Sequence, residues 1–434
     1  MSWQEYYQSR IITADDAIKL LKKGDHVING HGTGEPQLLP EALVRNQHMV
    51  EGIVVAHGIA LGPSVYCRED VDPQRVQHLT VFAGTHTRKA VKEQRARFVP
   101  MHFSDCPIAM RNGTIKVDVA WTQVSPPDKH GFCTFGISCD YERAAVEAAR
   151  LVVAEVNPNM PRTYGDTLIH VSEIDYFVLS DRPLIEMQKP EIGSVETTIG
   201  RYVADLVEDG ATMQFGMGGI PNAIVGFLKE KNDLGINSEL FSDGAMELMI
   251  SGNVTNKYKK LHPGKSTTTF AAGTKELYEW LDHNPAVEFY PVDYINNSYM
   301  IAQNDKVVSV NSALQVDLMG QVAAETINGV QYSGIGGQMD FVRGATWSKG
   351  GKSVIALPAT AKNGTISRIV AAFNPGDAVT TPRNDVDYVI TEYGVAHLRG
   401  KDMQERARLL ISIAAPQFRD QLKEDYERIY KYKL

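Results

Sequence analysis

The chain has 434 residues, of which 43% are hydrophobic and 22% charged, and its formal net charge is −8. This composition is typical of a folded globular protein, and the length favours two domains over a single core. The negative charge argues against broad binding to nucleic acid or to an anionic membrane, although a local cluster of donors can still hold a small polyanion.

The four cysteines and the N-terminus indicate the compartment. The cysteines form no CxxC pair and no zinc-ligand spacing with histidine, so we expect buried free thiols in a reducing environment. The N-terminus lacks the basic and apolar segments of a signal peptide. No apolar run reaches the ~20 residues needed to span a bilayer. We therefore expect a cytoplasmic protein.

The first half of the chain alternates short β-rich runs with helical patterns. Thr13 is a credible N-cap for a helix that ends at Gly24, and a second helical pattern runs through 38–43. Between them the strand 27–29 leads into the glycine loop 30–36. Apolar runs of this length between helices predict strands buried on both faces of a mainly parallel sheet. The further predicted strands are 53–56, 79–82, 117–120 and 151–154.

Two irregular stretches interrupt this alternation. The stretch 125–133 is rich in Pro, Asp and Gly and is predicted to be a loop, either functional or a plain connection. From Arg182 to Gly193 the apolar periodicity lapses. We place the domain boundary there, between an N-terminal domain 1–190 and a C-terminal domain 191–434.

The two predicted domains repeat one pattern of elements. Residues 17–24 align with 203–210, and each segment leads through a short strand to a glycine loop with proline. The aligned loops are 30–36 and 216–221, and the aligned late strands are 174–178 and 386–390. We interpret this as an internal duplication that gives two similar α/β domains with mainly parallel sheets. The alternative is a chance similarity between helix–glycine–strand units.

One stretch of the second half, 235–244, places a single carboxylate, Glu239, on a short segment closed by the turn dipeptide Asp243-Gly244. The glycine-rich loop 216–221 lies before it, and a helix is expected to begin after Pro221. Such a strand-to-helix turn exposes backbone N–H groups and could hold a phosphate, a pantetheine chain or an oxyanion. The other explanation for the glycines of this loop is tight packing alone.

A second glycine-rich loop, predicted over 332–344, contains the pair Gly336-Gly337. If the two loops face one another, their amides could together stabilise a carbonyl oxygen that becomes negative. Lys362 follows the predicted strand 354–358. It is either a charge for a phosphate or carboxylate, or an ordinary solvated lysine.

Several other chemistries lack their motifs. The chain contains no dinucleotide fingerprint with its acidic residue, no Gly-x-x-x-x-Gly-Lys-Ser/Thr loop and no Gly-x-Ser-x-Gly elbow. The twelve histidines show no HExxH or similar metal pair, so no metal site is expected. A carboxylate nucleophile remains as the candidate, and covalent catalysis by glutamate is established chemistry.

Many segments, in order along the chain, match one family. They are 124–128 with 131–132, 154–157, 170–175, 238–239 with 242–244, 291–296, 336–341, 391–394 and 398–401. Through them the chain resembles the class I CoA-transferases, and most closely the branch of 4-hydroxybutyrate and butyryl-CoA:acetate CoA-transferases. That branch is related to acetyl-CoA hydrolases and to succinyl-CoA:acetate transferases.

The resemblance implies two similar α/β domains with the site in the cleft between them. It places the catalytic glutamate on Glu239 and the oxyanion donors on the backbone amides of Met217 and Gly337. The CoA-contacting glycine loop then consists of Gly216, Met217, Gly218, Gly219 and Ile220. Further implied contacts to CoA or to a carboxylate are Asn296, Leu314, Ser333, Gly337, Lys362 and Glu392.

The resemblance also implies an activity. This is ping-pong transfer of CoA between acetyl-CoA and a short-chain carboxylate such as 4-hydroxybutyrate or butyrate, through a glutamyl-CoA thioester. CoA and acyl-CoA are substrates, no cofactor is permanently bound, and neither nucleic acid nor membrane is a partner. By family analogy the protein is a homodimer or a higher homo-oligomer.

Three alternatives stay open at this point. They are acetyl-CoA hydrolysis, succinyl-CoA:acetate transfer, and a non-catalytic ligand-binding relative of the same fold. The identity of the acid cannot be read from the sequence, because one hydroxyl or methylene changes discrimination by only ~1–3 kcal/mol in an apolar pocket.

Overall fold

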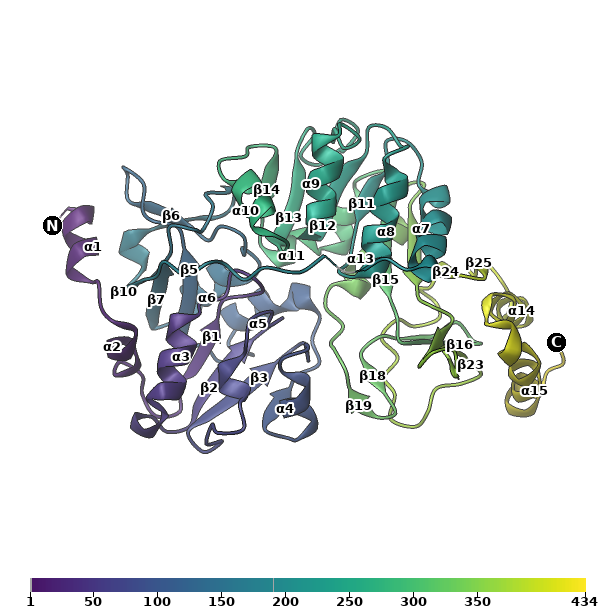
Figure 1. The fold of residues 1–434 in the computed structure, drawn as a ribbon, viewed down its shortest axis with the longest axis horizontal. Helices are drawn as coiled ribbons and strands as arrows, with labels where there is room; N and C mark the ends of the chain where they lie inside the picture. Colours follow the sequence, from purple (N-terminus) through teal and green to yellow (C-terminus); the bar gives the residue numbers. More distant parts are fainter. Residues whose placement is uncertain (1, 190) are drawn as a thin grey trace. The chain divides into compact units, whose positions relative to one another are not determined.

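A computed structural model describes residues 2–189 and 191–434. The chain divides into two compact units, each of which contains a parallel sheet with helices (Figure 1). The first unit comprises Met1–Gln188, Phe241–Asp243 and Thr267–Ile295, and the second comprises Lys189–Leu240, Gly244–Ser266 and Asn296–Leu434. The domain boundary predicted at Pro190 falls on a residue outside the described ranges and stays a prediction.

The first unit contains a seven-stranded parallel sheet with the order β10-β7-β5-β1-β2-β3-β4. The chain builds outward from β1 in both directions, so the order reverses between β1 and β5. In open α/β sheets, ligands bind at the carboxyl ends of the strands near such a reversal. The strands are β1 (His26–Asn29), β2 (Ile53–His57), β3 (Val76–Thr80), β4 (Ala96–Phe98), β5 (Val119–Val124), β7 (Leu151–Val156) and β10 (Tyr176–Leu179).

Helices cover both faces of this sheet. Val27 packs in one core cluster with Leu43 of α3, whereas the next residue, Ile28, packs in another with Met110 of α5 and Ala145 of α6. Successive strand residues point to opposite faces, so both faces must be apolar. The near-continuous apolar runs in the sequence follow from this burial.

The remaining elements of the first unit surround the sheet. Its helices are α1 (Trp3–Ser9), α2 (Ala14–Ile18), α3 (Leu38–Arg45), α4 (Arg88–Lys92), α5 (Cys106–Arg111), α6 (Glu142–Ala148), α10 (Lys275–Leu281) and α11 (Val292–Ile295). Its shorter strands are β6 (Phe132–Thr134), β8 (Tyr164–Gly165), β9 (Leu168–His170), β14 (Val287–Phe289) and β13 (Ser266–Ala271), which joins this unit from Thr267 onward.

The second unit repeats the strand order of the first. Its parallel strands run β24-β20-β15-β11-β12, and β25 adds an antiparallel edge. In each set the first strand, β1 or β11, lies between its successor and a later strand, and two still later strands extend the sheet. The predicted internal duplication requires this shared order. The strands are β11 (Thr212–Gln214), β12 (Gly235–Phe241), β15 (Val307–Ser312), β20 (Lys352–Ala356), β24 (Tyr388–Thr391) and β25 (Gly394–His397).

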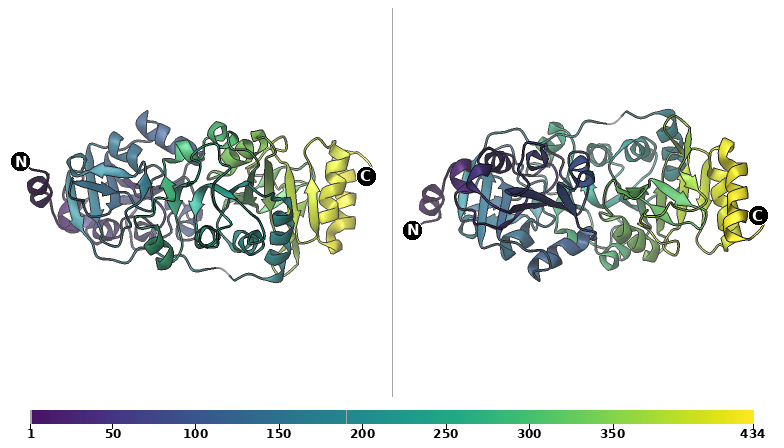
Figure 2. Two further views of the ribbon diagram at one scale, coloured as in Figure 1. Left: turned by 90° about the horizontal axis from the view of Figure 1, so that it is seen from above. Right: turned by 90° about the horizontal axis from the view of Figure 1, so that it is seen from below.

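Helices and small hairpins complete the second unit. At the C-terminal end of the chain, α14 lies against β25 and α15 packs beside α14 (Figure 2). The helices are α7 (Ser194–Leu206), α8 (Gly219–Leu228), α9 (Asp243–Ile250, in this unit from Gly244), α12 (Ser298–Ala302), α13 (Gln338–Trp347), α14 (Met403–Ile413) and α15 (Arg419–Tyr430). The small strands are β16 (Gln315–Asp317), β17 (Val322–Ala323), β18 (Thr326–Ile327), β19 (Val330–Gln331), β21 (Thr360–Ala361), β22 (Ile366–Ser367) and β23 (Ile369–Val370).

The elements predicted in the first half are confirmed, with shifted ends. Thr13 caps α2 by accepting the Asp16 N–H, but that helix ends at Ile18 rather than at Gly24. β3 begins at Val76 because 76–80 pair in register with β2, and the predicted loop 125–133 ends inside β6. All four cysteines (Cys67, Cys106, Cys133 and Cys139) are buried free thiols, as predicted. Within the described ranges, every helix falls short of the length and apolar character needed to cross a bilayer.

Candidate functional site

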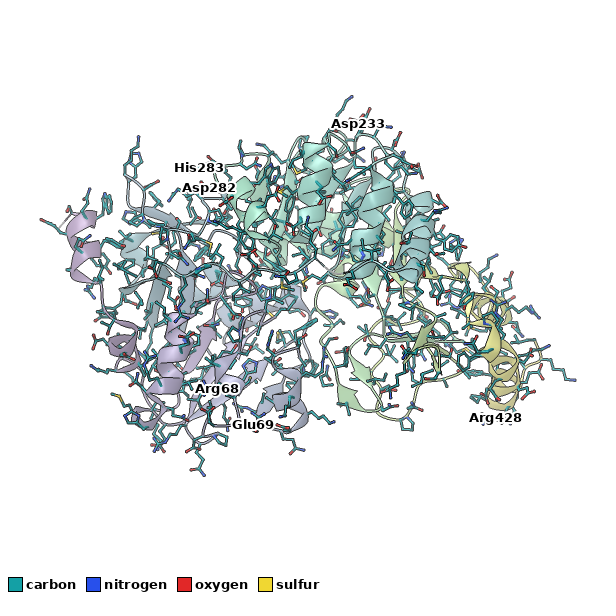
Figure 3. The ribbon with its side chains drawn as sticks, viewed as in Figure 1. Arg68, Glu69, Asp233, Asp282, His283 and Arg428 are labelled. Carbon is teal, nitrogen blue, oxygen red and sulfur yellow. The ribbon has the colours of Figure 1, made fainter. Side chains whose placement is uncertain are left out.

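Glu239 lies near the carboxyl end of β12. Asp233, labelled in Figure 3, precedes this strand at its amino end. β12 pairs with β11 in the register Met213↔Ile236, and β11 ends at Gln214. Continuing that register brings Glu239 level with the glycine loop that follows β11. The turn predicted at 243–244 is wrong, because these residues open helix α9.

The Glu239 carboxylate meets two predicted site residues that are distant in sequence. The side-chain amide of Asn296 donates to Glu239 Oε2 at 2.5 Å. A Cβ added to Gly337 would lie 2.1 Å from the same oxygen and 2.2 Å from Asn296 Nδ2. Gly337 has φ −94°, so it is required for space and not for backbone conformation. The three residues therefore form one compact group, which we call the carboxylate group.

The amide of Asn296 is fixed in this orientation. Asn296 is fully buried, and its amide oxygen has no hydrogen-bond partner among the described residues. A carboxylate only accepts hydrogen bonds, so the nitrogen must face Glu239. Buried polar atoms without a partner are rare and are often found at functional sites.

The predicted loop 332–344 is shorter than expected. Helix α13 begins at Gln338, with Gly337 at its N-cap, so only 332–337 form a loop. Gly336 has φ +55°, which glycine tolerates best, and it directly precedes the N-cap of the helix. The Glu239 carboxylate thus lies at the N-terminus of a ten-residue helix. The positive end of a helix dipole stabilises negative charge.

The glycine loop after β11 leads directly into α8. The helix begins at Gly219, two residues before Pro221, and not after it as predicted. Proline fits the first turn of a helix because its missing N–H has no partner there. Gly218 has φ +126°, a conformation open to glycine, and Met217 beside it is 41% exposed. The loop therefore presents exposed backbone at the carboxyl edge of the sheet.

Ser238, the residue before Glu239, ties β12 to this loop. Its Oγ accepts the Phe215 N–H at 3.2 Å and donates to the Phe215 carbonyl at 3.2 Å. Phe215 directly precedes Gly216, so the strand of the carboxylate and the glycine loop are held together by one buried hydroxyl. The sequence alone gave Ser238 no role beyond its place in a matching segment. A small hydroxyl residue inside a buried strand is the signal that points to such a bond.

A carboxylate lies against the glycine loop. A Cβ added to Gly219 would be 3.1 Å from Cγ of Glu196, and Glu196 Oε2 accepts the Gly193 N–H at 3.1 Å. Negative charge at this point disfavours a phosphate directly beside Gly219.

Two other predicted site residues lie in loops of the second unit. Leu314 comes after β15 and donates its N–H to the Ala323 carbonyl at 2.8 Å. Ser333 donates its hydroxyl to the Ala324 carbonyl at 2.9 Å, which fixes the loop before α13. Each residue thus forms a structural hydrogen bond of its own.

Two further predicted residues, Lys362 and Glu392, follow the strands β20 and β24. Glu392 accepts the Ala359 N–H at 2.7 Å. Lys362 is exposed at the tip of the β21–β22 hairpin and has φ +48°. Both belong to the same carboxyl edge of the sheet as the glycine loop, since they follow β20 and β24. Among the described residues no three His, Cys, Asp or Glu side chains gather as a metal site would require.

Comparison with known proteins identifies the family. Residues 1–187 match the acetyl-CoA hydrolase/transferase N-terminal domain, and residues 273–426 match the corresponding C-terminal domain. The chain is 50% identical to a 4-hydroxybutyrate coenzyme A transferase of Clostridium kluyveri, over 99% of this chain and 100% of that protein. It is 46% identical to a succinyl-CoA:cyclohexane-1-carboxylate CoA transferase of Geobacter metallireducens, over 99% and 97% of the two chains.

A solved structure has the same fold over the whole chain. RipA from Yersinia pestis superimposes with a TM-score of 0.94 at 37% identity, and the match covers 100% of both chains. Matches of this length and identity extend over both units of the chain. The protein therefore belongs to the acetyl-CoA hydrolase/transferase family.

Proposed function

We propose that this protein is a CoA-transferase that moves CoA between acetyl-CoA and a short-chain carboxylate such as 4-hydroxybutyrate or butyrate. The observation that carries the proposal is the Glu239 carboxylate held by Asn296 at 2.5 Å beside the glycine N-cap of α13. The full-length relative named for 4-hydroxybutyrate supports the choice of substrate class.

The reaction proceeds through Glu239 in two halves. The carboxylate attacks the thioester carbonyl, the C–S bond breaks, and an acyl-glutamyl anhydride and CoA thiolate form. The thiolate then attacks the glutamyl carbonyl and expels the first acid as its carboxylate, leaving a glutamyl-CoA thioester. The second acid attacks this thioester through the mirror-image steps. It leaves as acyl-CoA and returns Glu239 to a carboxylate.

A carboxylate is a weak nucleophile, so the site must contribute position and charge stabilisation. Asn296 holds Glu239 Oε2, and the missing Cβ of Gly337 keeps the space around that oxygen free. The backbone amides of Met217 and Gly337 are the proposed donors to the developing oxyanion. One such donor is typically worth about 3–4 kcal/mol of the barrier.

Hydrolysis of acyl-CoA is the second candidate, because the matching family includes hydrolases by name. Water would then replace the second acid in attacking the glutamyl-CoA thioester. Measuring CoA release from acetyl-CoA with and without added acetate separates the two activities. Transfer predicts no net release of free CoA in either mixture, because CoA passes from one thioester to another, whereas hydrolysis predicts release in both.

Borohydride reduction tests the covalent intermediate. Incubation of the enzyme with acetyl-CoA followed by borohydride should inactivate it by reducing the glutamyl-CoA thioester, and mass spectrometry should locate the change at Glu239. Glu239→Ala should lose transfer and resist labelling, while Glu239→Asp should keep a trace because its shorter arm misplaces the carboxylate. Full activity after borohydride would exclude the glutamyl thioester.

An acceptor panel tests the substrate class. Acetate, butyrate, 4-hydroxybutyrate, succinate and water are compared as acceptors from one acyl-CoA donor, with kcat/KM as the readout. We expect the monocarboxylates to be preferred over succinate and water. Preference for succinate would support the succinyl-CoA:acetate alternative.

The family resemblance also supports a proposal for the oligomeric state, compartment and cofactor use of the protein. We infer a cytoplasmic homodimer or higher homo-oligomer that uses CoA as a substrate and carries no permanently bound cofactor. Light scattering coupled to size-exclusion chromatography measures the mass of the assembly directly. A monomeric mass at micromolar concentration would contradict the inference.

A further inference from the structure

One half-buried cation lies among the predicted contacts of the second unit and has no role so far. Arg368 stands between β22 and β23. Its backbone N–H donates to the Ala359 carbonyl at 2.8 Å, and its own carbonyl accepts the Val316 N–H at 2.9 Å. These bonds fix it between the segments that leave the carboxyl ends of β20 and β15.

The Arg368 guanidinium is poorly satisfied by the protein. Its one side-chain hydrogen bond in the described structure is long, at 3.4 Å from Nη1 to the Ala313 carbonyl. Within the described ranges it forms no ion pair with a carboxylate. Arginine carries several N–H donors in a fixed planar fork, so most of its donor capacity is unused.

Arg406 of the same unit shows what a purely structural arginine looks like. It is buried, and its guanidinium donates to three backbone carbonyls, those of Met319, Leu398 and Arg383, at 2.8–3.1 Å. Burying a guanidinium is costly unless its donors are used. Arg406 meets this condition within the protein, whereas Arg368 does not.

The surroundings of Arg368 are the predicted contact residues. Ala313 directly precedes Leu314, and Ala359 donates to Glu392. Burial lowers the pKa of Arg368, while Tyr332 and Glu392 raise it, which places both of these groups nearby. Lys362 lies at the tip of the hairpin that Arg368 follows.

CoA carries its anionic groups far from its sulfur, at the nucleotide end of the molecule. Glu196 adds negative charge beside Gly219 of the glycine loop, whereas Arg368 carries positive charge. The hydrogen bonds of Arg368 join it to Ala313, Ala359 and Val316, none of which belongs to the carboxylate group. A guanidinium matches phosphate with parallel hydrogen bonds.

Resting on the proposed function, we propose that the Arg368 guanidinium binds a phosphate group of CoA, with exposed Lys362 adding positive charge on the same hairpin. The glycine loop then takes the uncharged pantetheine arm. Binding energy at such a remote group can offset the cost of positioning the thioester on Glu239.

Calorimetric titration of CoA and of pantetheine, which lacks the phosphates, tests this without requiring turnover. Arg368→Gln should weaken CoA binding by about 10- to 100-fold, the usual range for a charge-assisted hydrogen bond, and change pantetheine binding less than twofold. Arg368→Lys should restore part of the affinity. Dephospho-CoA, which lacks the 3′-phosphate, shows which phosphate Arg368 contacts. If Arg368→Gln does not weaken dephospho-CoA binding, the contact is to the 3′-phosphate. If it weakens dephospho-CoA and CoA binding equally, the contact is to the diphosphate.

The control is Arg408→Gln, which removes the same charge from an exposed position on α14 and should leave both affinities unchanged. Equal weakening of CoA and pantetheine by Arg368→Gln would overturn the proposal, and so would an unchanged CoA affinity. If CoA binds as expected but the acceptor panel shows no transfer, the proposed function fails and the phosphate contact stands.

Discussion

Asn296 is the residue whose single hydrogen bond defines the carboxylate group. We expect Asn296→Ala to lower kcat by about 10²–10³-fold with little change in KM for acyl-CoA, because the lost donor orients the reacting oxygen. Initial rates of CoA exchange at saturating acid measure this. A kcat within threefold of the wild type would contradict a role for the contact.

Asn304 is a matched control in the same unit. It is also fully buried, and its side-chain oxygen accepts the N–H groups of Lys260 and Leu261 at 3.0 and 3.1 Å. Asn304→Ala should lower the thermal midpoint, because two backbone donors lose their acceptor, and should leave kcat of the folded protein intact. Comparing the two variants separates chemistry from stability.

Gly337 gives a steric test of the same group. In Gly337→Ala the new Cβ needs the space of Glu239 Oε2 and Asn296 Nδ2, so both side chains must shift. We expect kcat to fall at least about 100-fold because the carboxylate is displaced. Gly226→Ala is the control, since its Cβ meets nothing within 4 Å on α8. It should stay fully active, and thermal midpoints of both variants check folding.

At the scale of single residues, the sequence singled out Glu239 as a candidate but did not show that Asn296 and Gly337 contact its carboxylate. Asn296 and Gly337 were named through the family resemblance, and 57 residues separate Asn296 from Glu239 along the chain. No local pattern reports a contact of that range. Arg368 was missed for a related reason, because an arginine is normally exposed and only its burial with unused donors marks it.

At the scale of elements, helix α3 begins on a buried carboxylate. Glu155 of β7 is fully buried, and its oxygens accept the N–H groups of Gln37 at 3.1 Å and Leu39 at 2.7 Å. These bonds replace the side-chain cap that Gln37 does not provide. Burial nevertheless raises the pKa of Glu155 to about 7 from an ordinary value of 4.5.

The raised pKa predicts a pH-dependent stability. Between about pH 4.5 and pH 7 the folded chain holds a proton on Glu155 that the unfolded chain has lost, so stability falls as pH rises through this window. The wild type should lose roughly 3 kcal/mol at most relative to Glu155→Gln, which does not titrate. Urea midpoints of both proteins at pH 5 and pH 8 measure this, and parallel changes would contradict it.

Secondary structure was predictable where apolar runs are short and glycine follows. The strands before both glycine loops, β1 and β11, appear where expected. Helix starts were less predictable: α8 begins before Pro221 and α13 begins at Gln338. In both cases a glycine N-cap without a side-chain acceptor starts the helix, and this leaves no Ser, Thr, Asp or Asn signal to read.

At the scale of the whole molecule, the first unit is completed by a segment far along the chain. Residues 267–295 belong to it, and they contribute the buried side chains Phe270, Leu277, Phe289 and Val292. The Thr33 hydroxyl donates to the Ala271 carbonyl, and the Val292 N–H donates to the Asp140 carbonyl. The sequence predicted a duplicated pattern of elements but gave no sign that residues 267–295 belong to the first unit.

Cutting the chain after residue 190 should therefore yield two incomplete products. Fragment 1–190 lacks part of its unit, and fragment 191–434 exposes the apolar side chains of 267–295. We expect each alone to bind a hydrophobic dye and to be degraded quickly by protease, and co-expression to restore resistance. The intact chain is the reference. A protease-resistant, dye-free fragment 191–434 would contradict this.

The segment 267–295 also determines when the first unit can finish folding during synthesis. The first unit ends its continuous stretch at Gln188, yet its last strands and helices are made only when the ribosome reaches Ile295. Ribosomes add about 5–20 residues per second, so synthesis from Gln188 to Ile295 takes roughly 5–20 s. During this time the first unit lacks residues 267–295. We therefore expect its incomplete form to bind a chaperone that recognises nascent chains.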